Sequence, residues 1–339
     1  MSLSPKIGLL AMAYGTPSRP EEILPYYTDI RHGHAPSPAE LAGLTHRYEA
    51  IGGRSPLTEI TEAQVAALSA VLESRHPGTR FPAYPGMKHA SPSIPEAIAR
   101  MVGDGIERAV GLVLAPLYSQ GSTDEYARLV KDAREKAGGS PQGLTIIGAW
   151  HDAPRFRKFV ERQVQRALDS FPDSVRPDVE VVFTAHSLPV RLAEMGDPYA
   201  VELRDVAEET AESLGLTRYR IGWQSAGRTQ DRWLGPDILD ILRSDAERGV
   251  KGFLVVPVGF CSDHLEILYD LDIDAAELSR KLGVAFARTP SPNVHPDFIE
   301  ALADAVDRGL RGEGLLRLDR IPSAQTHGPS TVHGAGRRP

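Results

Sequence analysis

The stretch Leu9-Leu10-Ala11-Met12-Ala13-Tyr14-Gly15-Thr16-Pro17 is a short apolar run that ends on a polar side chain and a turn. The stretch Val182-Phe183-Thr184-Ala185-His186-Ser187-Leu188-Pro189 follows the same plan much later in the chain. Each run has the length and composition of a β-strand that is buried on both faces. The likeness predicts that the chain is built from two similar halves.

Further apolar runs, with segments of helical period between them, predict an α/β architecture with parallel strands. The expected strands are Lys6–Ala13, Thr79–Pro85, Arg108–Ala115, Leu144–Trp150, Val179–Ala185, Arg218–Gln224, Gly252–Val258 and Val284–Ala287. They divide into two sets of four. We therefore expect two similar Rossmann-like halves, each a four-stranded parallel sheet flanked by helices.

This division sets the expected domain boundaries. Residues 1–174 form the N-terminal half, which carries an insert at residues 18–56, and residues 175–320 form the C-terminal half. Residues 321–339 are rich in Pro, Gly, Ser and His and lack any periodicity. We expect this last segment to be a disordered tail.

Composition excludes several classes of protein. The chain has 339 residues, one cysteine and a formal net charge of −7. A single cysteine excludes an internal disulfide or a four-cysteine iron–sulfur cluster, and the acidic charge argues against nucleic acid as the partner. No apolar run approaches the roughly 20 residues of a transmembrane helix, and no export signal is seen, so a cytoplasmic location is expected. Glycine-rich phosphate motifs are missing, so no nucleotide cofactor is expected.

Ligands of parallel sheets bind beyond the carboxyl ends of the strands, and two facing halves could enclose one cleft there. Tyr14, His186 and Glu266 follow three of the expected strands. Together, His186 and Glu266 could bind a divalent metal or accept protons. A purely structural histidine is the alternative.

Glu266, Asp270 and Asp274 are four residues apart, a spacing that places three carboxylates along one stripe of a helix. A cation that moves along the stripe would relieve their mutual repulsion. The alternative is a solvated acidic face.

The insert is rich in Arg, His and Tyr over Tyr26–His34 and His46–Pro56. Arginine binds carboxylates through two hydrogen bonds, and tyrosine offers a flat apolar face with a polar end. This combination suits a large, flat, carboxylated ligand. A solvated loop with ordinary surface arginines is the alternative.

Taken together, these segments resemble the ferrochelatase family, and within it the coproporphyrin III branch of Gram-positive-type bacteria. The resemblance runs from about Ile7 to Leu310. Its motifs are Met12-Ala13-Tyr14-Gly15-Thr16-Pro17, Tyr48-Glu49-Ala50-Ile51-Gly52-Gly53-Arg54-Ser55-Pro56, Ala185-His186-Ser187-Leu188-Pro189, Gly222-Trp223-Gln224-Ser225, Trp233-Leu234-Gly235-Pro236, and Pro257-Val258-Gly259-Phe260 leading to His264-Leu265-Glu266.

The resemblance implies two halves around a central porphyrin cleft, in which Fe²⁺ is inserted into coproporphyrin III to give coproheme, with release of two pyrrole protons. It implies that His186 and Glu266 handle metal and protons, that Asp270 and Asp274 form a carboxylate path behind them, and that Tyr14 is an axial ligand of the product iron. The porphyrin-contacting positions that it implies are Tyr14, Arg31, Arg47, Tyr48, Ser55 and Tyr126. His32 stands where relatives have a second basic residue, and no iron–sulfur cluster is expected.

Two alternatives share parts of this pattern. One is a cobalt chelatase that acts on an early tetrapyrrole, and the other is a tetrapyrrole or metal carrier without turnover. Coproporphyrin III and ferrous iron are the expected partners, with transient contact to neighbouring enzymes of haem synthesis as a further option. The chain is expected to be a monomer.

Overall fold

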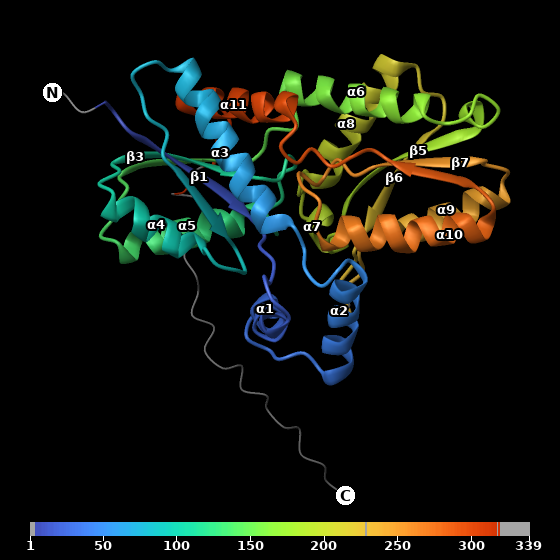
Figure 1. Cartoon of the computed structure of the whole chain (residues 1–339), viewed down its shortest axis with the longest axis horizontal. Coiled ribbons are helices and arrows are strands. Elements are labelled where there is room, and N and C mark those ends of the chain that lie inside the picture. Colours follow the sequence, from blue (N-terminus) through green and yellow to red (C-terminus); the bar gives the residue numbers. More distant parts are fainter. Residues whose placement is uncertain (1–3, 228, 317, 319–339) are drawn as a thin grey trace, which may run out of the picture.

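The eight expected strands are present in the computed structural model, which describes residues 4–227, 229–316 and 318 (Figure 1). Their bounds are β1 (Ile7–Ala13), β2 (Ala83–Met87), β3 (Arg108–Val113), β4 (Gly143–Ile147), β5 (Val179–His186), β6 (Tyr219–Gln224), β7 (Gly252–Val256) and β8 (Ala285–Arg288). The tail at 321–339 lies outside the described residues.

The strands form two sheets with the same order. The first sheet runs β2-β1-β3-β4 and the second runs β6-β5-β7-β8, with all of these neighbours parallel. Strands β1 and β5 hold equivalent inner places, and nearly all their residues are buried, as in sheets covered on both faces. The shared order confirms the α/β fold with two similar halves.

The first sheet differs from expectation in having a fifth strand. Strand β9 (Leu315–Leu316) pairs antiparallel with β4. It is too short to carry a strand period in sequence. It is brought there by helix α11 (Pro296–Leu310), which packs on the first half. The packing therefore crosses the expected boundary between residues 1–174 and 175–320, and those bounds remain a prediction.

Helices cover both faces of the sheets (Figure 1). Helices α3 (Leu57–Arg75), α6 (Pro154–Asp169), α8 (Tyr199–Leu214) and α11 share one apolar core that includes Leu9, Phe183 and Phe298, so this core is common to both halves. The opposite face is covered by α4 (Ile94–Gly103) and α5 (Thr123–Lys136) on the first sheet, and by α9 (Ile238–Glu247), the π-helix η3 (Ile267–Ala275) and α10 (Ala276–Leu282) on the second. Short connections are η1 (Pro20–Glu22), η2 (Arg176–Asp178) and α7 (Val190–Glu194).

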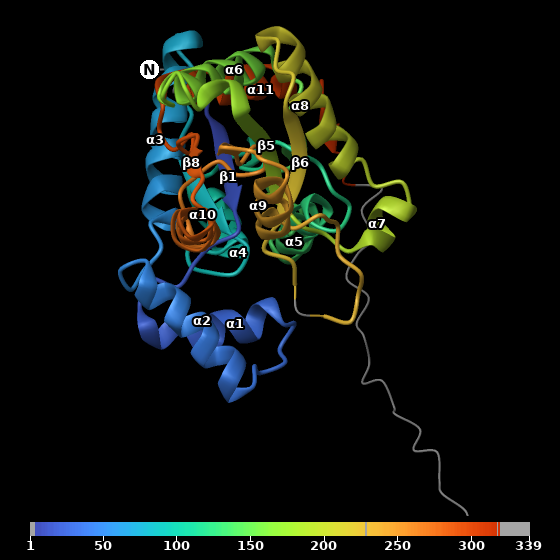
Figure 2. The same ribbon diagram turned by 90° about the vertical axis from the view of Figure 1, so that its right-hand side faces the viewer.

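The insert forms two helices, α1 (Ile23–Ile30) and α2 (Pro38–Ala50), which stand clear of both sheets in Figures 1 and 2. An apolar cluster fastens them to the second half, because Ile23 and Tyr48 pack with Leu265. The guanidinium of Arg47 also lies 4.8 Å from the centre of the Tyr269 ring. The insert is therefore docked beside the segment that carries Glu266.

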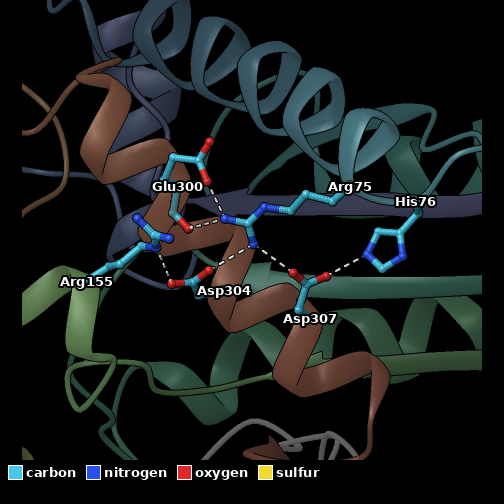
Figure 3. Close-up of polar contacts among 6 residues, drawn as sticks. All are labelled: Arg75, His76, Arg155, Glu300, Asp304 and Asp307. Carbon is cyan, nitrogen blue, oxygen red and sulfur yellow. Dashed lines mark hydrogen bonds and ion pairs between the residues drawn. The ribbon is translucent and has the colours of Figure 1, made fainter.

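A network of charged side chains joins α3, α6 and α11 (Figure 3). Its members are Arg75, His76, Arg155, Glu300, Asp304 and Asp307. Arg75 lies 2.9 Å from Asp304 and 2.7 Å from Asp307. Because Glu300, Asp304 and Asp307 are neighbours on one face of α11, they would repel one another without this cation. Arg75 thus helps to hold α11 on the first half.

We expect Arg75→Met to lower the free energy of unfolding by about 1–3 kcal/mol, since it removes several charged hydrogen bonds and leaves three carboxylates together. Urea denaturation measures the change. Arg19→Met is the matched control, because Arg19 is mostly exposed and its ion pair with Glu22 lies within one turn, and it should cost less than about 0.5 kcal/mol. Equal losses in the two variants would mean that the network does not hold the halves together.

Candidate active site

A cleft of about 570 Å³ lies where the carboxyl ends of the two sheets meet, a volume within the usual range for small-molecule sites. Its walls include residues that follow β1, β2, β3, β5 and β7, together with parts of the insert. Six of the site residues expected from sequence line it: Tyr14, Tyr48, Ser55, Tyr126, His186 and Glu266. The cleft thus joins residues from both halves.

His186 and Glu266 form an ion pair in the cleft. His186 is the last residue of β5, and Glu266 directly precedes η3. The Nε2 atom of His186 lies 3.4 Å from Oε1 of Glu266, and both side chains are partly exposed to the cleft. Since β5 and β7 are neighbours in the sheet, the segments that follow them are brought together at one edge.

The tautomer of His186 is fixed by the backbone. Its Nδ1 lies 2.6 Å from the carbonyl oxygen of Ser187 and donates to it, so Nε2 faces Glu266. In a neutral ring the Nε2 lone pair would face the negative charge of Glu266, and this repulsion favours a protonated ring. Burial disfavours the charged ring, but the Glu266 charge and hydrogen bond outweigh it and raise the pKa of His186 to about 9.

Glu266 is held between two imidazoles. Its second oxygen, Oε2, lies 3.6 Å from Nε2 of His264, whose Nδ1 is 3.0 Å from the carbonyl oxygen of Ser262. Burial alone would raise the pKa of Glu266, but the charge and hydrogen bond of His186 hold it well below its usual range. Glu266 is therefore a carboxylate with a proton held on the neighbouring imidazole.

Tyrosines form much of the remaining wall. Tyr14 follows β1, is 40% exposed, and stacks at a tilt against His89 with 4.6 Å between ring centres. The hydroxyl of Tyr48 lies 3.0 Å from that of Thr16. Burial within the cleft, followed by the charge of Glu266, raises the pKa of Tyr14. The Tyr14 phenol is thus neutral near pH 7.

Four of the expected site residues do not line the cleft. Arg31 is 2.9 Å from Glu40. Arg47 is paired with Asp270, which also accepts a hydrogen bond from the Ser225 hydroxyl. Burial raises the pKa of Asp270 to about 6, although the charge of Arg47 acts against this. Asp274 lies further along η3 and is half-buried; burial raises its pKa as well.

The segment expected to be an α-helix is a π-helix over Ile267–Ala275. Its i→i+5 bonds widen each turn, and such segments are frequent at functional sites. Two of the three carboxylates have different partners: Glu266 contacts two histidines, while Asp270 contacts Arg47. In the part of the chain that the structure describes, no group of three or more His, Cys, Asp or Glu side chains is arranged to hold a metal ion.

Sequence reasoning missed Lys88 and His89, which also line the cleft. They follow β2, which ends at Met87 rather than at the expected Pro85. Reading the residues beyond the true strand end would have found them. Arg191, Tyr199 and Trp233 were missed as well, since they come from segments with no strand signal of their own.

Comparisons with known proteins agree with the resemblance found in the sequence. The ferrochelatase family model matches residues 6–310. The coproporphyrin III ferrochelatase of Anoxybacillus flavithermus is 44% identical over 309 residues, covering 91% of this chain and 98% of that protein. The coproporphyrin III ferrochelatase of Bacillus subtilis is 44% identical over 306 residues, covering 90% of this chain and 98% of that protein.

Solved structures show the same fold at much lower identity. The sirohydrochlorin chelatase SirB of Bacillus subtilis subspecies spizizenii, in complex with cobalt, matches with a TM-score of 0.56 at 11% identity, covering 92% of this chain and 100% of that one. Among the described residues, no helix is both long and apolar enough to cross a membrane. Because the family match runs from β1 to the end of α11 and includes every residue that lines the cleft, the chain belongs to the ferrochelatase family.

Proposed function

We propose that this protein inserts Fe²⁺ into coproporphyrin III to give coproheme for haem synthesis, with release of two pyrrole protons. The observation that carries the proposal is the His186–Glu266 pair in a cleft of suitable volume. The chain is 44% identical to relatives named coproporphyrin III ferrochelatase, which supports this substrate.

The reaction requires a base and a metal-binding group at the same place. A free-base porphyrin carries two N–H protons, and Fe²⁺ must replace both. We assign His186 the role of proton acceptor and Glu266 the roles of metal ligand and proton relay. Since imidazole and carboxylate are common ligands of borderline divalent metals, His186 also serves as a metal ligand.

The raised pKa of His186 implies that metal binding at Glu266 comes before His186 accepts a pyrrole proton. Near pH 7 the imidazole of the free enzyme already carries a proton, because Glu266 stabilises its charge. When Fe²⁺ approaches Glu266, its positive charge offsets that of the carboxylate, and the imidazole releases its proton to solvent in the cleft to become neutral. The arriving metal thus prepares His186 to accept a pyrrole proton.

The remaining roles follow the family resemblance. Tyr14 ligates the product iron through its phenol oxygen, and Asp270 and Asp274 form a path for metal or protons behind Glu266. Tyr14, Tyr48, Ser55 and Tyr126 contact the porphyrin from the cleft wall, a role that suits their place there. Arg31 and Arg47 contact propionates only after they leave Glu40 and Asp270. We also propose a monomer in the cytoplasm, without an iron–sulfur cluster or a nucleotide, that contacts neighbouring haem-pathway enzymes transiently.

An anaerobic assay with Fe²⁺ and excess coproporphyrin tests the function. An enzyme converts many equivalents of porphyrin per protein chain, whereas a carrier changes the absorption spectrum by one equivalent. Parallel reactions with Co²⁺ and with early tetrapyrroles test the cobalt chelatase alternative. Product limited to one equivalent, or preferred turnover of an early tetrapyrrole with cobalt, would contradict the proposal.

We expect His186→Ala to lower kcat for metallation by about 100-fold or more, which is the usual contribution of a general base. The affinity for metal-free coproporphyrin, measured by fluorescence quenching, should change less than about three-fold, because the propionates are held elsewhere. His34→Ala is the control, since His34 is exposed on the insert and does not line the cleft. Activity of His186→Ala close to that of the control would remove His186 from the mechanism.

We also expect the imidazole of His186 to titrate near pH 9 in the free enzyme. Glu266→Gln should lower this pKa to about 6.5 or below, because the neutral amide no longer stabilises the charged ring. Folding raises this pKa, so protonation of His186 contributes its full stabilisation at about pH 6.5, and this contribution is lost as the pH rises through about 9. Titration of the ring nitrogens by NMR measures the shift, with Asp274→Asn as the control that should leave it unchanged.

A further inference from the structure

Two lysine or arginine side chains line the cleft in the part of the chain that the structure describes. Lys88 is only 7% exposed and is bound to Glu125, and its ammonium lies over the rings of Tyr14 and Tyr126. Arg191 is 62% exposed, and its Nε atom lies 3.9 Å from Asp231. The Lys88 ammonium is therefore already bound by protein groups, whereas the ion pair between Arg191 and Asp231 is long and exposed.

The two insert arginines that the family resemblance assigns to porphyrin contact, Arg31 and Arg47, are not available to a ligand in the free protein. Arg31 is paired with Glu40 and Arg47 with Asp270, and neither lines the cleft. A carboxylated ligand that enters the cleft would have to break these pairs before it could use those two cations. Among the described residues, Arg191 is thus the arginine that is available to the ligand from the start.

Arg191 stands on a turn that is fixed at both ends. Helix α7 (Val190–Glu194) begins beside the loop that holds Trp233, where the Val190 N–H donates to the carbonyl of Arg232 at 2.8 Å. After α7, the buried carboxylate of Asp197 accepts the hydroxyl of Ser119 and the N–H of Gln120, both at 2.8 Å. These bonds tie the turn to the first half as well as to the second.

Close packing restricts α7 further. A Cβ atom at Gly121 would lie 2.5 Å from the side chain of Leu192, so Leu192 fits directly against this glycine. Figures 1 and 2 show α7 apart from the insert helices α1 and α2. Arg191 and the insert therefore meet the cleft from different elements, and the backbone that carries Arg191 needs little ordering on binding.

We propose that Arg191 binds a carboxylate of the porphyrin on the α7 side of the cleft and thereby selects porphyrins that carry carboxylates on all four pyrrole rings. The inference rests on the proposed function. Coproporphyrin has four propionates, whereas protoporphyrin has two, on adjacent rings. A guanidinium can hold a carboxylate through two parallel hydrogen bonds. At 3.9 Å the salt bridge to Asp231 is weak, so a porphyrin carboxylate can replace Asp231 as the partner of Arg191.

The test compares coproporphyrin with protoporphyrin in the wild type, Arg191→Ala and Arg191→Lys. We expect Arg191→Ala to raise KM for coproporphyrin about two- to five-fold, the upper part of the range for one charged contact near a surface, with kcat unchanged. KM for protoporphyrin should change less than about two-fold. Arg191→Lys should recover part of the loss, and 0.5 M salt should shrink the difference, because screening weakens such pairs.

Arg243→Ala is the matched control, because Arg243 is an exposed arginine on α9 that pairs with Asp240 away from the cleft. It removes the same charge and should leave both KM values unchanged. Arg191→Gln gives a second variant should the alanine variant fold poorly. Equal changes for both porphyrins, or none, would overturn the role of Arg191, whereas a wild type that metallates neither porphyrin would overturn the proposed function instead.

Discussion

The contact between His186 and Glu266 is the interaction on which the rest of the site depends. It exists because β5 and β7 are parallel neighbours, so that the segments beyond their carboxyl ends meet. The backbone carbonyl of Ser187 fixes the ring so that Nε2 points at the carboxylate. The imidazole thereby carries a proton directly beside a carboxylate, the arrangement to which we assign proton transfer and metal binding.

The other parts of the fold position this pair. The first half supplies wall residues such as Tyr14, and the insert contributes Tyr48 to the lining and packs on Leu265, next to Glu266. The Arg47–Asp270 pair fastens the insert at the same place.

Much of the fold could be predicted from the sequence, because strands buried on both faces are continuous apolar runs and residues after such strands gather at one edge. His186, Glu266 and Tyr14 were found in this way. The partners of Arg31 and Arg47 could not be found, since Glu40 and Asp270 become neighbours only through the packing of the insert. Lys88 was missed because the expected strand ended two residues early, and β9 was missed because two residues carry no period.

The most direct test of the account is a double-mutant cycle on His186 and Glu266, measured as kcat for insertion of Fe²⁺ into coproporphyrin. If the two side chains act as one unit, His186→Ala combined with Glu266→Gln should be no slower than the worse single variant, within about three-fold. Losses that multiply in the double variant would show that the two residues act independently, and would contradict the central role assigned to their contact.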